Sequence, residues 1–161
     1  MINTEPTNTI HSTFVPQPIV RVKLDPGATA PRYNNVDPLT GDAGADIFPL
    51  ESGTVPAKSR KLIKTGVHME FAPGYRGRMH SRSGLSLKNG VETGAGLIDN
   101  SYRGDIGVML YNHGDEAFHY SPEKAVSQIC IERFEQAIFE VVDELGDSSR
   151  GEKGFGSSDR A

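Results

Sequence analysis

The stretch GAGLIDNSYRGDIGVMLYN, residues 94–112, contains both a strand pattern and candidate chemistry. Its second half, DIGVMLYN, is a short β-like run. Its first half places Asp99 directly after an apolar pair and follows it three residues later with Tyr102. An Asp at a strand end commonly caps a turn. Beside a bound phosphate, the same carboxylate could act as a general base or position a water molecule, and the tyrosine could stack on a sugar or base.

Similar β-like runs lie on both sides of this stretch, separated by glycine or proline. They are PIVRVKL, ADIFPL, RKLIKTGVHMEF, YRGRMHS and EAFHYS, at residues 18–24, 45–50, 60–71, 75–81 and 116–121. Residues 25–44 are rich in Pro, Gly, Asn and Asp and predict a loop, and SRSGLSLKNG (81–90) predicts a loop or a single turn. Many short strands with regular turn signals predict an all-β barrel or sandwich with little helix.

One segment, residues 126–145, is ambiguous. Its apolar residues follow helical spacing. Its enrichment in β-branched and aromatic residues favours two strands, broken near Glu135 and Gln136. The pattern alone leaves both interpretations open.

The length of 161 residues suits one domain. We expect a flexible N-terminal tail over 1–16, a β-barrel catalytic domain over 17–145 and a mobile C-terminal arm over 146–161, because both ends are polar and the last is rich in Gly and Ser. No apolar run is long enough to span a membrane, and the N-terminus lacks the features of a signal peptide. The single cysteine, Cys130, reads as a small core residue and fits a reducing compartment, so we expect a cytoplasmic, nuclear or viral-host intracellular protein that is not secreted.

The net charge of −4 gives no reason to expect direct binding to nucleic acid. Residues 52–91 are different, because they hold eight Lys or Arg against one acid. Such a cationic zone could bind a small anion, or it could be a solvated strand face.

Three glycine-bearing segments combine small residues, hydroxyls and a cation: RSGLS (82–86), GAGLIDNSYRG (94–104) and RGEKGFGSS (150–158). Backbone N–H groups, serine hydroxyls and arginine together can bind a polyphosphate. The five histidines and the single cysteine have no metal-ligand spacing. A metal, if used, would be Mg²⁺ carried on phosphate oxygens. The chain has no P-loop sequence.

Five pieces in this order resemble the trimeric deoxyuridine triphosphatases. They are AGADI (43–47), RSGLSLKNG (82–90), GAGLIDNSYRGDIGVMLYN (94–112), AVSQICIERF (125–134) and RGEKGFGSSD (150–159). The resemblance implies a β jelly roll that assembles as a homotrimer, with active sites shared between subunits. It also implies Mg²⁺-assisted hydrolysis of dUTP to dUMP and pyrophosphate, which keeps uracil out of DNA and supplies dUMP for thymidylate synthesis. It favours two strands over residues 126–145.

The resemblance also implies roles for single residues. Asp99 would orient and deprotonate the water that attacks the α-phosphorus, and Tyr102 would pack under the deoxyribose. The expected substrate-binding residues comprise the phosphate turn (Arg82, Ser83, Gly84), the uracil hairpin of residues 93–98 (with Thr93, Gly96, Leu97 and Ile98), Gln128, and the arm residues Arg150, Phe155, Gly156 and Ser157. Asp46 would lie near the phosphates and act on the metal only indirectly.

Several positions depart from the family pattern. Ser81 stands where the family usually has proline, which should loosen the phosphate turn. Ala125 occupies a usually basic position, and Lys153 and Asp159 replace glycines.

Two other functions fit the same pieces. A dCTP deaminase has a related fold and needs a glutamate base, for which Glu92 is a candidate. A trimeric nucleotide-responsive binding or regulatory protein is the other.

Overall fold

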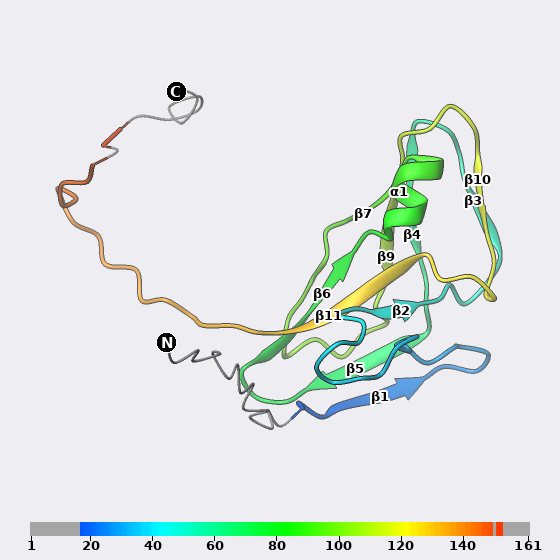
Figure 1. Cartoon of the computed structure of the whole chain (residues 1–161), viewed down its shortest axis with the longest axis horizontal. Helices are drawn as coiled ribbons and strands as arrows, with labels where there is room; N and C mark the ends of the chain where they lie inside the picture. Colours follow the sequence, from blue (N-terminus) through cyan, green and yellow to red (C-terminus); the bar gives the residue numbers. More distant parts are fainter. Residues whose placement is uncertain (1–16, 150, 153–161) are drawn as a thin grey trace, which may run out of the picture.

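The computed structural model describes residues 17–149 and 151–152. The expected all-β, jelly-roll-like class is confirmed, because within these residues short antiparallel strands close around one core and a single short helix lies on them (Figure 1). The elements are β1 (Val20–Leu24), β2 (Ala45–Ile47), β3 (Gly53–Val55), β4 (Ser59–Ile63), β5 (Val67–Phe71), β6 (Tyr75–His80), α1 (Ser83–Asn89), β7 (Val91–Gly94), β8 (Leu97–Ile98), β9 (Val108–Asn112), β10 (Phe118–Tyr120) and β11 (Ser127–Arg133).

The strands form four small antiparallel sheets. Their orders are β1-β5, β10-β3, β2-β11-β6-β8 and β4-β9-β7. Strands β5 and β9 alternate buried and less buried residues, as expected for strands with one face on a core. The inward side chains meet in one cluster that includes Ile47, Val67, Val108, Leu110 and Ile129.

The run RKLIKTGVHMEF is two strands, because Gly66 adopts a positive φ of 66° between β4 and β5 and turns the chain. Residues 25–44 contain no strand apart from the isolated bridge between Arg32 and Asp46, as expected for a loop. Across the described residues, no helix is long and apolar enough to span a membrane.

The prediction of a loop or single turn over 81–90 is wrong, because α1 occupies Ser83–Asn89. Gly90 ends the helix in the left-handed conformation, with φ 63°, and its N–H donates to carbonyls of the last turn. The glycine that read as a loop signal is therefore a helix C-cap.

The two-strand expectation for residues 126–145 is right for one strand only, and the helical interpretation is wrong. One strand, β11, spans Ser127–Arg133 between β2 and β6, whereas residues 134–145 form neither a second strand nor a helix. Figure 1 shows this stretch leaving the barrel as an extended segment. Ile138, Phe139 and Val141 are 97%, 93% and 99% exposed, because nothing in the described chain lies beside them to pair with or cover them.

Candidate functional site

A partly buried ion pair anchors the predicted phosphate turn. Asp46 on β2 is 8% exposed, Arg82 Nε lies 3.1 Å from Asp46 Oδ1, and Arg82 Nη2 donates to Asp46 Oδ2 at 3.4 Å. Arg82 also donates from Nη1 to the carbonyl of Ala125 at 2.8 Å, and Asn34 Nδ2 donates to Asp46 Oδ2 at 3.0 Å. These contacts fix the guanidinium in one orientation, so its remaining donors can face a ligand without further ordering.

This pair borders a hollow of about 670 Å³, here called the Arg82 hollow. Its lining includes five of the sequence-predicted residues: Asp46, Arg82, Ser83, Gly84 and Gln128. Gln128 on β11 donates from Nε2 to the carbonyl of Ser81 at 2.9 Å, which ties the strand to the start of the turn. Cys130 also lines this hollow and is only half-buried, so the expectation of a core cysteine is wrong; partial burial still raises the pKa of its thiol.

The 93–98 segment is not a hairpin of its own, which corrects the expectation. Thr93 and Gly94 belong to β7, which pairs with β9, whereas Leu97 and Ile98 form β8, which pairs with β6. Ala95 between them has a positive φ of 48°, and this turn sends the chain from one sheet to the other. The segment therefore crosses between two sheets.

The two glycines of this segment are explained by packing within the chain. A Cβ at Gly94 would collide with the ring of Tyr111, and one at Gly96 would lie 2.6 Å from the carbonyl oxygen of Met79. Close strand contact is thus sufficient to require glycine at both positions. A second hollow of about 490 Å³, the β6 hollow, lies beside the segment and is lined by Arg76, Arg78, Met79, His80, Ser81, Thr93, Gly96 and Leu97.

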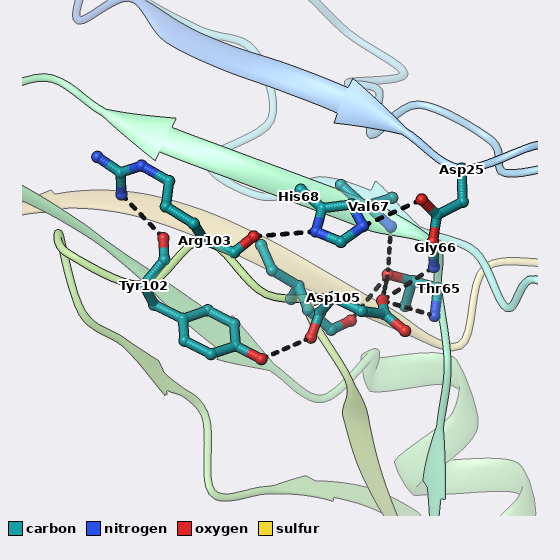
Figure 2. A network of polar contacts seen from close by, with 9 residues as sticks. Asp25, Thr65, Gly66, Val67, His68, Tyr102, Arg103 and Asp105 are labelled. Carbon is teal, nitrogen blue, oxygen red and sulfur yellow. Dashed lines mark hydrogen bonds and ion pairs between the residues drawn. The ribbon is translucent and has the colours of Figure 1, made fainter.

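Asp99 follows β8 directly and is exposed. The loop after it is tied to the barrel by Asn100, whose Nδ2 donates to the carbonyls of Ala72 at 2.9 Å and Tyr75 at 2.8 Å. Tyr102 is 46% exposed, and its hydroxyl donates to the carbonyl of Asp105 at 3.0 Å (Figure 2). The ring is held at its tip while a large part of its surface stays accessible.

A polar network beneath this loop connects it to β5 (Figure 2). Asp105 Oδ1 accepts from the N–H of Gly66 at 2.9 Å and from the Thr65 hydroxyl at 3.2 Å. His68 lies between two acceptors, with Nδ1 3.0 Å from the carbonyl of Arg103 and Nε2 3.2 Å from Asp25 Oδ1. The hydrogen bond to the Arg103 carbonyl, and then that to Asp25, raise the pKa of His68 above its ordinary value.

This network predicts a pH-dependent stability. Because the folded-state pKa of His68 is raised, the contribution of His68 to the free energy of unfolding is fully present below its unfolded-state pKa. That contribution is lost as pH rises through the folded-state pKa. The free energy of unfolding lost in His68→Gln should therefore be larger at about pH 5.5 than at about pH 8, measured by urea denaturation at fixed protein concentration. In an Asp25→Asn background the pH dependence should shrink. A loss that is equal at both pH values would contradict the role of His68.

The predicted residues form two groups within one chain. Ile98 pairs with Gly77, so Asp99 lies beyond that pair, toward the start of β6, whereas Arg82 lies past the other end of the strand. With a rise of about 3.3 Å per residue, roughly 20 Å separates the two. Asp99 and Tyr102 line neither the Arg82 hollow nor the β6 hollow. One chain therefore does not bring the acid and the phosphate turn together.

The described residues contain no cluster of His, Cys, Asp or Glu suited to hold a metal ion. The Asp46 carboxylate already accepts from Arg82 and Asn34. A protein-held metal centre therefore does not fit this part of the chain. Arg150, Phe155, Gly156 and Ser157 lie outside the described residues.

Three polar residues near the site were missed from the sequence: Asn34, Asn100 and Asp105. Each acts through its side chain on a loop, and Asn and Asp in loops are too common to single out. For Asn100 and Asp105, the signal available was their place after a strand end and before the next strand.

Comparison with known proteins gives one consistent result. The family model described as dUTPase matches residues 36–159. The deoxyuridine 5′-triphosphate nucleotidohydrolase of Helicobacter hepaticus is 40% identical over 138 residues, which are 84% of this chain and 85% of that protein. The protein of the same name from Eremothecium gossypii is 35% identical over 158 residues, 96% and 97% of the two chains.

Among solved structures, a mutant dUTPase of Staphylococcus bacteriophage 80alpha with dUpNHpp has a TM-score of 0.78 and 28% identity. The match covers 87% of this chain and 98% of that one. The similarity thus extends over nearly the whole chain.

Proposed function

The chain belongs to the dUTPase family, and from this premise we propose that it hydrolyses dUTP to dUMP and pyrophosphate. The observation that carries the proposal is the Arg82 hollow. There a guanidinium fixed by a buried carboxylate lies with Ser83, Gly84 and Gln128 around a space of about 670 Å³. Fixed cationic and hydroxyl donors are what a chain of phosphates requires.

In this proposal Asp99 is the general base. Its carboxylate is exposed at a strand end, and the bonds of Asn100 hold the following loop against the barrel. It orients one water molecule in line with the α-phosphorus and takes its proton as the P–O bond to pyrophosphate breaks. The accessible face of Tyr102 packs under the deoxyribose and leaves no room for a 2′-hydroxyl. Arg82 offsets charge that develops on the phosphates.

The separation of Asp99 from Arg82 supports a site shared between subunits. A group on one chain would meet the phosphate turn of another in a closed homotrimer. The exposed apolar residues Ile138, Phe139 and Val141 agree with such an assembly, because nearly complete exposure of three neighbouring apolar side chains is unfavourable in a monomer. The residues 150–161 would close over the site of a neighbour.

The contacts of Glu92 argue against a deaminase. Ser81 Oγ donates to Glu92 Oε2 at 2.6 Å, and hydrogen bonds from Ser81 and then Ser86 lower the pKa of this carboxyl. A carboxylate held in its charged form by two hydroxyls is a weak base. Uracil would instead be read by backbone groups of the 93–98 segment.

Magnesium enters as part of the substrate. Because Mg²⁺ prefers oxygen and keeps several waters, it would be bound on the triphosphate, where it neutralises phosphate charge. Asp46 would act on it only through Arg82. Chelation with EDTA should lower the rate of dUTP hydrolysis by at least about tenfold, and added Mg²⁺ should restore it. An unchanged rate in EDTA would exclude this use of the metal.

The direct test compares pyrophosphate release from dUTP, dTTP, dCTP and UTP. We expect kcat/KM for dUTP to exceed that for each of the others by about 100-fold or more. Cytosine would leave buried polar groups mismatched, at a cost of about 1–3 kcal/mol each, whereas the thymine methyl and the 2′-hydroxyl of UTP would clash. Ammonia release from dCTP would instead indicate a deaminase. Equal rates with all four nucleotides would refute the proposed specificity. In the cell, this reaction would keep uracil out of DNA and supply dUMP for thymidylate synthesis.

A further inference from the structure

Strand β6 contacts the 93–98 segment through backbone hydrogen bonds along its length and through a side chain just past its C-terminal end. Backbone pairing runs from Gly77 with Ile98 to the bond between the Met79 N–H and the Gly96 carbonyl, at 2.8 Å. Beyond it the contact continues through the side chain of Ser81. Its Oγ donates to Glu92 Oε2 at 2.6 Å and accepts from the N–H of Thr93 at 2.9 Å.

The bond to Thr93 replaces a missing strand partner. Strand β7 is the last strand of its sheet in the described part of the chain, with β9 on one side only. The N–H groups on its outer edge therefore need a partner from elsewhere. Ser81 provides one for Thr93, and the Thr93 hydroxyl donates to the buried Ser127 Oγ at 3.1 Å.

Ser81 is also tied to the phosphate side of the site. It precedes Arg82 directly, and its carbonyl accepts from Gln128 Nε2 at 2.9 Å. It lines both the Arg82 hollow and the β6 hollow. One residue thus contacts β7, β11 and the turn, and its hydroxyl is used both as donor and as acceptor.

We propose that Ser81 is a positioning residue that fixes the 93–98 segment relative to the turn formed by Arg82, Ser83 and Gly84. The inference rests on the proposed function for its kinetic consequence: in the proposed trimer the 93–98 segment of a chain reads the base at one site and its Arg82 turn binds phosphates at a neighbouring site, so loss of the hydroxyl would loosen substrate binding at both. The hydroxyl strengthens the turn instead of loosening it. Asp99 follows β8, which backbone pairing with Gly77 and Arg78 of β6 holds without Ser81, so the bond-breaking step should change less than substrate binding.

The variants separate the hydroxyl from the size of the side chain. Ser81→Ala removes both hydrogen bonds, whereas Ser81→Thr keeps a hydroxyl. Glu92→Ala removes the acceptor that orients the hydroxyl and is the second variant if Ser81→Ala does not fold. Ser59→Ala is the matched control, because Ser59 is exposed on β4 and lines neither hollow.

Two readouts are measured on each variant: KM and kcat for dUTP, and hydrogen exchange of the Thr93 amide by NMR. Ser81→Ala should raise KM about tenfold with kcat changed less than about threefold, and should speed Thr93 exchange at least about tenfold. Ser81→Thr and Ser59→Ala should match the wild type in both. Glu92→Ala should shift both readouts in the same direction by less, and adding it to Ser81→Ala should have little further effect.

Unchanged KM and unchanged Thr93 exchange in Ser81→Ala would overturn the inference. So would equal impairment in Ser81→Thr, which would indicate a role for shape alone. If the wild type does not hydrolyse dUTP, the proposed function fails, and the Thr93 exchange of Ser81→Ala then decides by itself whether the hydroxyl holds the segment.

Discussion

Asp99→Asn should retain nucleotide binding and assembly while losing turnover by a factor of about 10³, within the range that loss of a positioned general base costs. The amide keeps the size of the carboxylate but cannot take a proton from water. Because Asp99 is exposed and no hydrogen bond within the described residues uses its carboxylate, the fold should not change. The measurement is kcat from pyrophosphate release, with dUTP affinity from equilibrium dialysis.

A matched control is Asp115→Asn, which removes another exposed carboxylate that pairs with Lys58 away from the site. It should leave kcat unchanged. Full turnover in Asp99→Asn would remove Asp99 from its proposed role, and loss of nucleotide binding together with turnover would point to a structural effect.

Ending the chain after Ser149 should preserve assembly and lower kcat/KM by about 100-fold or more. The removed residues include Arg150, Phe155 and Ser157, which in the proposed function would meet the phosphates and the base. Closure of such a segment excludes water and completes the charge around the phosphates. Steady-state kinetics and the mass in solution, from light scattering, measure the two parts of this prediction.

The control for this truncation is removal of residues 1–16. We expect this change to leave both the number of subunits in the assembly and the rate of dUTP hydrolysis unchanged. An undiminished kcat/KM in the chain ending at Ser149 would exclude a role for the arm. A loss of assembly would instead show that the residues after 149 hold the subunits together.

The strand content could be predicted from the sequence, because short apolar runs between turn residues are a local signal. The runs at 18–24, 45–50, 105–112 and 116–121 all contain strands. The helix α1 could not, since Ser83, Gly84 and Gly90 read locally as loop residues and only the left-handed cap at Gly90 reveals a helix end.

The segment 126–145 shows why periodicity misleads where apolar residues are not buried within the chain. In β11 the buried residues Ser127 and Ile129 alternate with less buried ones, as in a strand, although the full segment has helical spacing. The later apolar residues are exposed in a single chain, so their spacing carries no information about an intrachain core.

The site, like the fold, was predictable only in part. Family resemblance brought together Asp46, Arg82 and Gln128, which do share one hollow. It gave no indication that Ser81 bonds to Glu92 and Thr93, because those contacts depend on a residue that departs from the family pattern. It also implied a hairpin over 93–98, whereas the two halves of that segment pair with different strands.

The central claim is that Asp99 of one subunit acts on phosphates bound by Arg82 of another. Asp99→Asn and Arg82→Ala subunits, each inactive alone, can be unfolded together in equal amounts, refolded and assayed for dUTP hydrolysis. Random assembly of a ring with one shared site per interface predicts that roughly a quarter of the sites regain both groups. Recovery of about that fraction of wild-type activity is the expected result, and a mixture as inactive as its two components would contradict the claim.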